Sequence, residues 1–354
     1  MTEFVRTASL TGYDSAMRSL GVDPGPLLRE AGLSAELLAH PEQPISTRAL
    51  RHLLEQSADL TGCITLGLRM AEERAISDLG VASLVIAHQP TLGDVLNALQ
   101  ESIGRINSNL VLQMRRIGQE VVLRQEFSLN GPEPTRQSTD LGLGVLARLC
   151  FSIVGDGWSP LSVCFSHEAP PAPQMPIVGR LFRCDPQFDC EFNGLIIAAR
   201  DLDRPNLRAD QALARHAHGL MEIALPHQRT IAQDVEQMIL LSLSSGRATV
   251  QRCAASMGLA VRTLQRMLDV EGTSFSDLLH RTRMRFSMQY LINPRMRVTE
   301  VADLLGYAST GAFTRWHAQT FGMSPQQWRA QHIGKPGDAQ RSTAPPSGNA
   351  SGAR

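Results

Sequence analysis

Two sets of side chains, about fifty residues apart, carry the residue types that hydrogen-bond to the edges of DNA bases. The first set is Arg262, Thr263, Gln265 and Arg266, and the second is Thr310, Gly311, Thr314 and Arg315. Arginine can donate two hydrogen bonds to O6 and N7 of guanine, and glutamine can pair in a similar way with adenine. Any single arginine has a plainer explanation, because it can contact phosphate or only water. The repetition of the set is therefore stronger evidence for base contacts than any single arginine.

Each set belongs to one copy of a pattern that occurs twice, at residues 249–266 and at residues 298–315. The copies share a small residue and a glycine four positions later, which are Ala254 and Gly258 in the first and Ala302 and Gly306 in the second. A small residue lets two helices pack closely, and glycine accepts the positive φ of a tight turn. Each copy is therefore expected to form a helix-turn-helix, whose second helix enters the DNA major groove.

Apolar residues flank each turn and are expected to hold its two helices together. They are Val250, Met257, Leu259 and Leu264 in the first copy, and Val301, Leu304, Tyr307 and Phe313 in the second. Leu264 and Phe313 lie between the polar residues of their second helices and are expected to be buried. Trp316 and Trp328 are likewise expected to pack in the core rather than to stack on bases.

A long amphipathic stretch joins the two copies. Residues 276–291 are expected to form one helix with Arg281 and Arg285 on one face, and residues 231–243 are expected to form a helix that begins the module. Further arginines around the repeat are expected to grip phosphate and position the module, and these are Arg247, Arg252 and Arg297.

The net charge of zero conceals an asymmetry along the chain. Residues 1–246 hold 20 arginines and 28 acidic residues, a net charge of −8. Residues 247–329 hold 11 arginines and 5 acidic residues, a net charge of +6, and residues 330–354 add +2. A basic block beside an acidic one is typical of a nucleic-acid-binding module attached to a second unit. Because this block coincides with the repeat, a merely solvated basic surface is the weaker interpretation.

At these residues the chain resembles the AraC/XylS family of bacterial transcription regulators, whose DNA-binding domain has two helix-turn-helix motifs joined by a long helix. The resemblance is close over residues 231–331 and rests on five segments, at residues 263–266, 271–275, 302–307, 312–315 and 321–325. Residues 1–226 are more loosely similar to the arabinose-binding-type effector domain of one subfamily. That similarity is carried by residues 180–183, Phe188 and residues 202–205.

The sequence departs from the family where a small hydroxyl residue usually caps each recognition helix. Ala260 and Ala308 stand at these two positions. Loss of such a cap costs about 1 kcal/mol of helix stability, although Ser309 or Thr310 can serve in the second copy. A basic residue common after the second recognition arginine is replaced by Ala318. These changes leave the expected fold intact. They affect which bases are read and how tightly the DNA is bound.

The N-terminal region is expected to combine a helical leader with a small antiparallel sheet. Residues 1–80 show the three- and four-residue spacing of helices, whereas residues 110–127 alternate with period two and are expected to form a β-hairpin turning at Gly118. Residues 139–154 are expected to form a helix whose Gly142 and Gly144 pack closely on a neighbour. Shorter segments follow: strands near residues 161–165 and 190–197, a helix at residues 175–182, and a connecting helix and linker at residues 205–226.

No arrangement typical of an enzyme or a metal site occurs in the sequence. The six cysteines include no Cys-x-x-Cys pair, and His216 and His218 would point to different sides of a helix. Phosphate-binding glycine loops and the common hydrolase motifs do not occur either. No apolar run reaches the roughly eighteen residues that span a bilayer. We therefore expect a cytoplasmic protein that is not an enzyme and uses no cofactor or metal.

The sequence predicts an α+β N-terminal effector domain followed by an all-α domain with two helix-turn-helix motifs. The expected boundaries are residues 1–226 for effector sensing and dimerisation, 227–333 for DNA binding, and 334–354 for a disordered tail. The resemblance implies a sequence-specific transcription regulator, more often an activator than a repressor, that binds double-stranded DNA and a small-molecule effector. It also implies RNA polymerase as a partner and a homodimer as the assembly.

Two alternatives stay open at this point. The N-terminal domain could only dimerise the protein and sense no ligand, or it could be an enzyme joined to a DNA-binding domain. A metabolite that shifts the melting temperature of residues 1–226 would favour sensing. The effector itself is not identified, because the subfamily label does not establish arabinose, and amino-acid-derived, aromatic and fatty-acid molecules are all compatible with it.

Overall fold

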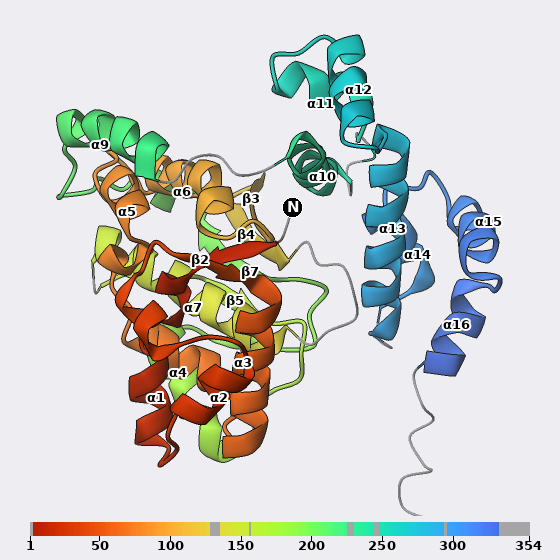
Figure 1. Cartoon of the computed structure of the whole chain (residues 1–354). Coiled ribbons are helices and arrows are strands. Elements are labelled where there is room, and N and C mark those ends of the chain that lie inside the picture. Colours follow the sequence, from red (N-terminus) through yellow and green to blue (C-terminus); the bar gives the residue numbers. More distant parts are fainter. Residues whose placement is uncertain are drawn as a thin grey trace, which may run out of the picture.

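The computed structural model describes residues 3–127, 135–155, 157–224, 230–243, 246, 248–293 and 296–332. Two hydrophobic clusters organise these residues, one made almost entirely by the N-terminal region and the other by the C-terminal helices. Figure 1 shows a mixed helical and stranded body followed by a group of helices around α13. The expected α+β region and all-α region are both present.

The N-terminal region begins with helices and one small sheet. Its helices are α1 (Tyr13–Ser19), α2 (Gly25–Glu30), α3 (Thr47–Thr61), α4 (Leu66–Glu72), α5 (Val81–Ile86) and α6 (Leu92–Ile106). Strand β1 (Phe4–Arg6) pairs antiparallel with β2 (Pro44–Ser46). The helical leader is thus confirmed with an addition, since these three-residue strands are too short to show a period in the sequence.

A five-stranded sheet follows in the order β3-β4-β7-β5-β6. Its strands are β3 (Leu110–Ile117), β4 (Glu120–Phe127), β5 (Ser162–Cys164), β6 (Pro186–Gln187) and β7 (Asn193–Ala198). The expected hairpin is β3 and β4, with Leu112 opposite Gln125, and Gly118 has the positive φ that its turn requires. The sheet is antiparallel apart from the short parallel pair β5 and β6.

Helix α7 (Arg136–Val154) is the centre of this region and is buried along most of its length. A Cβ on Gly67 of α4 would lie 2.2 Å from the carbonyl oxygen of Gln137, and one on Gly144 would lie 2.4 Å from Cβ of Ala71. Only glycine permits this close crossing of α4 and α7, as expected for Gly144. The short helix α8 (Pro176–Phe182) also packs on α7.

Helix α9 (Gln211–Ala224) lies against α5 rather than serving only as a connector. Ala214, Ala217 and Met221 are buried there, and the latter two join the N-terminal hydrophobic cluster. The expected linker beyond it lies outside the described residues. The predicted domain boundary near residue 226 therefore stays a prediction.

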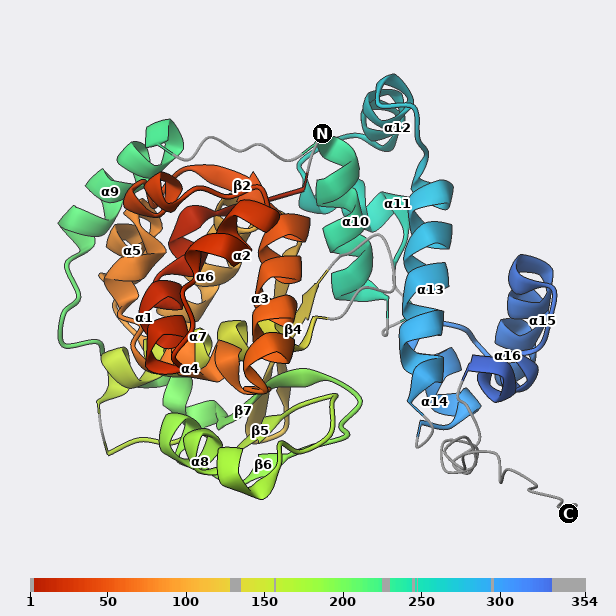
Figure 2. The same ribbon diagram turned by 60° about the horizontal axis from the view of Figure 1, so that its bottom comes forward.

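The C-terminal region consists of α10 (Ile231–Ser242), α11 (Val250–Ser256), α12 (Val261–Val270), α13 (Phe275–Ile292), α14 (Val298–Leu304), α15 (Thr310–Phe321) and α16 (Pro325–His332). Figure 2 shows α13 between the pair α11 and α12 at one end and the group α14 to α16 at the other. This is the expected arrangement of two helix-turn-helix units joined by a long helix.

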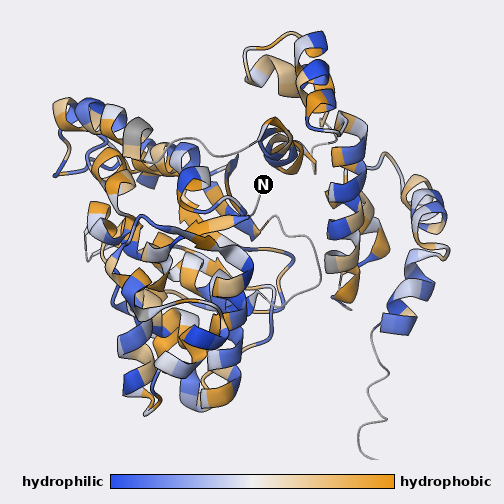
Figure 3. Cartoon of the chain, in the orientation of Figure 1, coloured by the Kyte–Doolittle hydropathy of each residue, from blue (hydrophilic) through white to orange (hydrophobic). Residues whose placement is uncertain are grey.

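Figure 3 shows hydrophobic and hydrophilic residues interspersed along the helices and strands of the N-terminal body, whereas the visible face of α13 is mainly hydrophilic. Among the residues that the structure describes, no helix is both long enough and apolar enough to span a bilayer. The expected disordered tail, residues 334–354, lies beyond the last described residue.

Candidate nucleic-acid interface

The first helix-turn-helix unit is α11 and α12. Gly258 turns the chain between them with φ of +65°, as its place in the repeat predicted. Leu264 and Leu268 are fully buried on one side of α12, whereas Arg262, Gln265 and Arg266 are exposed on the other, and Thr263 is half-buried. The amphipathic spacing of α12 therefore presents its polar hydrogen-bonding groups outward.

The second unit is α14 and α15, with Gly306 at φ of +68° in the turn. The Ser309 hydroxyl caps α15 by accepting a hydrogen bond from the Ala312 amide at 3.2 Å, whereas Ala260 gives α12 no side-chain cap. Phe313 is fully buried, as expected. Of the four proposed contact residues, Arg315 and Gly311 are exposed, and Thr310 and Thr314 are half-buried.

Several arginines at this surface are available to an external partner. Arg262, Arg266 and Arg315, together with Arg252 and Arg297, are exposed and make no side-chain hydrogen bond or ion pair with another described residue. Arg247, the remaining expected phosphate contact, lies outside the part of the chain that the structure describes. An exposed arginine without a counter-ion is the state expected of a side chain that meets a phosphate or a base.

Other arginines of the basic block have structural partners that sequence reasoning did not identify. The Arg283 guanidinium donates to the carbonyls of Leu305 and Gly306 at 3.0 and 3.2 Å and lies over the Tyr307 ring. Arg285 pairs with Glu236 of α10 at 2.8 Å. These side chains hold the second turn and α10 against α13. Their role depends on which carbonyls and carboxylates approach them in space, which the spacing of arginines does not reveal.

Arg329 has a similar structural role at the end of the chain. Its guanidinium donates to the carbonyls of Leu291 and Met296 at 3.0 and 2.7 Å, which ties α16 to the end of α13. The charge of the basic block is therefore divided between internal bracing and an outer set available to DNA.

Helix α10 contacts both helix-turn-helix units. The Glu271 carboxylate, just after α12, accepts hydrogen bonds from the amides of Ile231 and Ala232 at 2.9 Å each, where α10 begins. At the other end of α10, a Cβ on Gly306 would lie 2.3 Å from the Leu243 carbonyl oxygen. Both units are thus packed on one shared helix, which fixes their relative positions.

The β3–β4 hairpin of the N-terminal region contacts this helical module. The Arg124 guanidinium donates to the Tyr290 hydroxyl on α13 at 2.7 Å and pairs with Glu126, to which the Tyr290 hydroxyl also donates at 3.3 Å. Burial by itself would lower the pKa of Arg124, but the attraction and hydrogen bonds of Glu126 and Tyr290 together outweigh it, so the pKa of Arg124 is raised. Val111 of β3 belongs to the C-terminal hydrophobic cluster.

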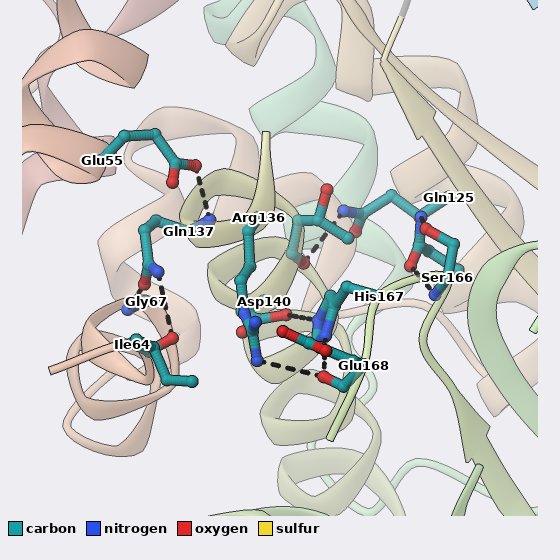
Figure 4. A network of polar contacts seen from close by, with 12 residues as sticks. Glu55, Ile64, Gly67, Gln125, Arg136, Gln137, Asp140, Ser166, His167 and Glu168 are labelled. Carbon is teal, nitrogen blue, oxygen red and sulfur yellow. Dashed lines mark hydrogen bonds and ion pairs between the residues drawn. The ribbon is translucent and has the colours of Figure 1, made fainter. Parts of the chain in front are cut away.

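A polar network fixes the start of α7 behind the hairpin (Figure 4). The Gln137 side chain accepts from the Gly67 amide at 2.9 Å and donates to the Ile64 carbonyl at 3.0 Å. Burial raises the pKa of Glu55, whose carboxylate accepts from the Gln137 amide at 2.8 Å. On the same helix, the buried Asp140 pairs with His167 at 2.8 Å. These contacts leave the first turns of α7 little freedom.

Comparisons with known proteins place this geometry in a family. The model described as the arabinose-binding domain of the AraC transcription regulator matches residues 21–206, and a helix-turn-helix domain model matches residues 253–331. The HTH-type transcriptional regulator VirS of Mycobacterium tuberculosis is 27% identical over 331 residues, which cover 92% of this chain and 96% of VirS. The ornithine utilization regulator of Pseudomonas aeruginosa is 22% identical with the same coverage.

A solved structure was also compared. The transcriptional regulator CdpR of Pseudomonas aeruginosa has 19% identity and a TM-score of 0.41 over 88% of this chain and 96% of CdpR. The first family model alone covers more than half of the chain, and the second coincides with the two observed helix-turn-helix units. The chain therefore belongs to the AraC family, as a DNA-binding helix-turn-helix transcription regulator and not an enzyme.

Proposed function

We propose that this regulator is a transcription activator whose affinity for its specific DNA site is controlled by a small-molecule effector bound in its N-terminal region. The observation that carries the proposal is the β3–β4 hairpin, which contacts the DNA-binding module with one face and borders an internal cavity with the other. A ligand in that cavity would touch the same two strands that contact α10 and α13.

The alternation of the two strands produces this arrangement. Leu112 of β3 and Gln125 of β4 lie opposite each other and line the cavity. The neighbouring pair, Gln113 and Arg124, faces the helical module, where the Gln113 amide donates to the Leu240 carbonyl at 3.0 Å. Successive residues of a strand point to opposite faces, so a shift of the strands on one face displaces the contacts on the other.

The DNA contacts that we propose follow the exposed faces of α12 and α15. Arg262, Thr263, Gln265 and Arg266 would reach bases in one major groove, and Thr310, Gly311, Thr314 and Arg315 would reach bases in the next. Arg252 and Arg297, with Arg247, would contact phosphate. The shared packing on α10 and α13 supports simultaneous entry into two grooves on one side of the DNA.

Genome-wide mapping of bound DNA tests the regulator function directly. The mapped sites should share a sequence long enough for two half-sites about one helical turn apart. Transcription from a gene beside such a site, measured with purified RNA polymerase, should rise when the full chain and its effector are both added. Repression of that gene would contradict activation. An activity that responds to no metabolite of the neighbouring genes would contradict effector control.

The hairpin contact can be tested separately. Tyr290→Phe removes the hydroxyl that bonds Arg124 and Glu126, while it keeps the ring in the core. We expect this variant to bind the mapped DNA as wild type does but to lose most of the response to the effector. Tyr13→Phe is the matched control, because among the described residues the Tyr13 hydroxyl bonds Ser57 alone, within the N-terminal region. An unchanged response of Tyr290→Phe would show that control does not pass through this contact.

The homodimer that the resemblance implies is a further part of the proposal. Light scattering of the full chain with and without DNA would test it. A stable dimer whose melting temperature responds to no metabolite would favour the alternative, in which the N-terminal region serves only to dimerise.

A further inference from the structure

The cavity behind the hairpin lies between the central elements of the N-terminal region and is partly open. It has a volume of about 110 Å³ and lies among α3, α6, α7 and the strands β3 and β4. An apolar cavity of about 150 Å³ is known to hold a benzene molecule. The cavity here is somewhat smaller but partly open, so its size is on the scale of a short aliphatic chain or a small ring.

Most of the cavity wall is apolar. Its lining includes Leu50, Leu99, Ile103, Leu112, Val145 and Leu146. A sugar carries a hydroxyl on almost every carbon, and each one buried against such a wall would lose its hydrogen bond to water. The wall thus disfavours a monosaccharide as the occupant and favours a molecule with an apolar body.

A second hollow of the same region differs in character. It lies between α6 and α9 and is bordered by polar and charged side chains, among them Asp94, Glu101 and Arg215. Apolar residues such as Val85, Ala98 and Met221 form only the smaller part of its lining, so it offers less apolar surface to an aliphatic or aromatic body. The contrast assigns an apolar ligand to the cavity behind the hairpin.

Several polar side chains interrupt the apolar wall of that cavity, and three of them matter most for a ligand: Ser138, Arg74 and Gln125. The Ser138 hydroxyl on α7 is buried and has no hydrogen-bond partner among the described residues. Arg74 is 5% exposed, and its guanidinium donates to the carbonyls of Ala8 and Ser9, while its Nε has no partner. The Gln125 amide donates to the Thr139 carbonyl at 3.3 Å. Buried polar groups normally have partners, so the unpartnered ones indicate an occupant.

The charge of Arg74 is incompletely balanced. No carboxylate of the described residues bonds to its guanidinium, and Asp78, the nearest acidic influence, accepts a hydrogen bond from the Ala75 amide instead. Burial lowers the pKa of Arg74 to about 10, while Asp78 acts in the opposite direction, so the side chain stays charged near neutral pH. A buried cation is stabilised by an anion that reaches it.

We propose that the effector is a small organic acid with an apolar body, aliphatic or aromatic, bound in this cavity. Its body lies against the leucine and isoleucine wall, its carboxylate is paired with Arg74, and the Ser138 hydroxyl donates to it. This proposal rests on effector control by the N-terminal region and specifies the site and the ligand class.

Binding to the full chain can be measured without DNA. The probes are hexanoate and benzoate, with their uncharged counterparts 1-hexanol and benzyl alcohol and with L-arabinose as comparators. At least one acid should bind with a Kd below about 1 mM and at least tenfold more tightly than its alcohol, since charge-assisted hydrogen bonds are the stronger class. Equal binding of acids and alcohols, or tighter binding of L-arabinose, would overturn the proposal.

Two variants locate the site. Ser138→Ala should weaken acid binding by roughly tenfold without lowering the melting temperature, because it removes a buried hydroxyl that has no partner among the described residues. Val145→Phe should fill the cavity and weaken binding by at least about tenfold. Ser152→Ala, on the same helix but outside the cavity lining, is the matched control and should bind as wild type does. Unchanged binding in both cavity variants would place the ligand elsewhere.

Arg74→Gln is a less direct test, because Arg74 also holds the carbonyls of Ala8 and Ser9, so a lower melting temperature is expected.

The transcription assay separates this proposal from effector control itself. If the acids bind but transcription does not respond to any metabolite, the site stands and effector control fails. If a metabolite changes transcription equally in wild type and Val145→Phe, effector control stands and the cavity is not its site.

Discussion

The two helix-turn-helix units come from the same sequence pattern but are held by different means. The first rests on a small aliphatic core and has an uncapped second helix, while its exposed face carries two arginines and a glutamine. The second has a capped helix and an aromatic core in which Tyr307, Phe313 and Trp316 contact one another. The first unit thus exposes more of the side chains that we propose for DNA contact, whereas the second, with its cap and aromatic core, is expected to contribute more of the module's stability.

The largest expected difference between the two units is the loss of stability when each turn glycine is replaced by alanine. Both have positive φ, for which alanine costs about 1–2 kcal/mol. A Cβ on Gly258 meets nothing within 4 Å, whereas one on Gly306 overlaps the Leu243 carbonyl, which adds about 1–3 kcal/mol. Urea unfolding of Gly258→Ala and Gly306→Ala should therefore show the second to be clearly less stable. Equal losses would mean that α10 can move away from the second turn.

A second contrast concerns the recognition arginines. Arg266→Ala and Arg315→Ala should each weaken binding to a mapped site by about 1–3 kcal/mol if the side chains reach bases. Titrations on the mapped site and on a random duplex distinguish the roles, because loss of a phosphate contact affects both duplexes equally. Arg208→Ala, an exposed arginine of the N-terminal region, is the control and should change neither affinity.

Removing the helix cap of the second unit and adding one to the first should change the stability in opposite directions, by smaller amounts. Ser309→Ala removes the bond to the Ala312 amide and should destabilise the protein by about 1 kcal/mol. Ala260→Ser, at the extended residue that precedes α12, should stabilise it by about 0.5–1 kcal/mol. Both changes can be followed as shifts in melting temperature. A loss of stability in Ala260→Ser would show that the first turn does not accept the serine cap geometry.

The smallest expected contrast depends on pH and on His317, which is fully buried in the second unit. Burial lowers the pKa of His317 below 6.5, although its hydrogen bond to the Met323 carbonyl acts the other way. The unfolded chain then binds a proton more readily than the folded chain, so stability falls as the pH drops below about 6.5. Melting temperatures between pH 5 and 8 should decline less steeply at low pH in His317→Gln. His216→Gln, at an exposed site, should keep the wild-type slope.

The sequence predicted most of the candidate interface because its signals are local. The paired glycines, the buried Leu264 and Phe313, and the substitute cap at Ser309 all follow from spacing within one helix-turn-helix. The arginines were harder to sort, because Arg283 and Arg329 have the same local appearance as Arg266. What distinguishes them is the approach of backbone carbonyls from distant residues, which no local pattern records.

The alternation of the hairpin was also visible in the sequence, and it determined which side chains share a face of β3 and β4. Which face borders the cavity and which meets Tyr290 was decided only when α7 and α13 packed on opposite sides. Both faces of the hairpin carry apolar residues, so hydropathy alone does not separate an internal wall from a contact between regions. Local periodicity thus determined the helices, the turns and the exposed side chains that we propose for DNA contact. Tertiary packing decided the cavity, the bracing arginines and the contact of the hairpin with α13, because these depend on groups far apart in the chain.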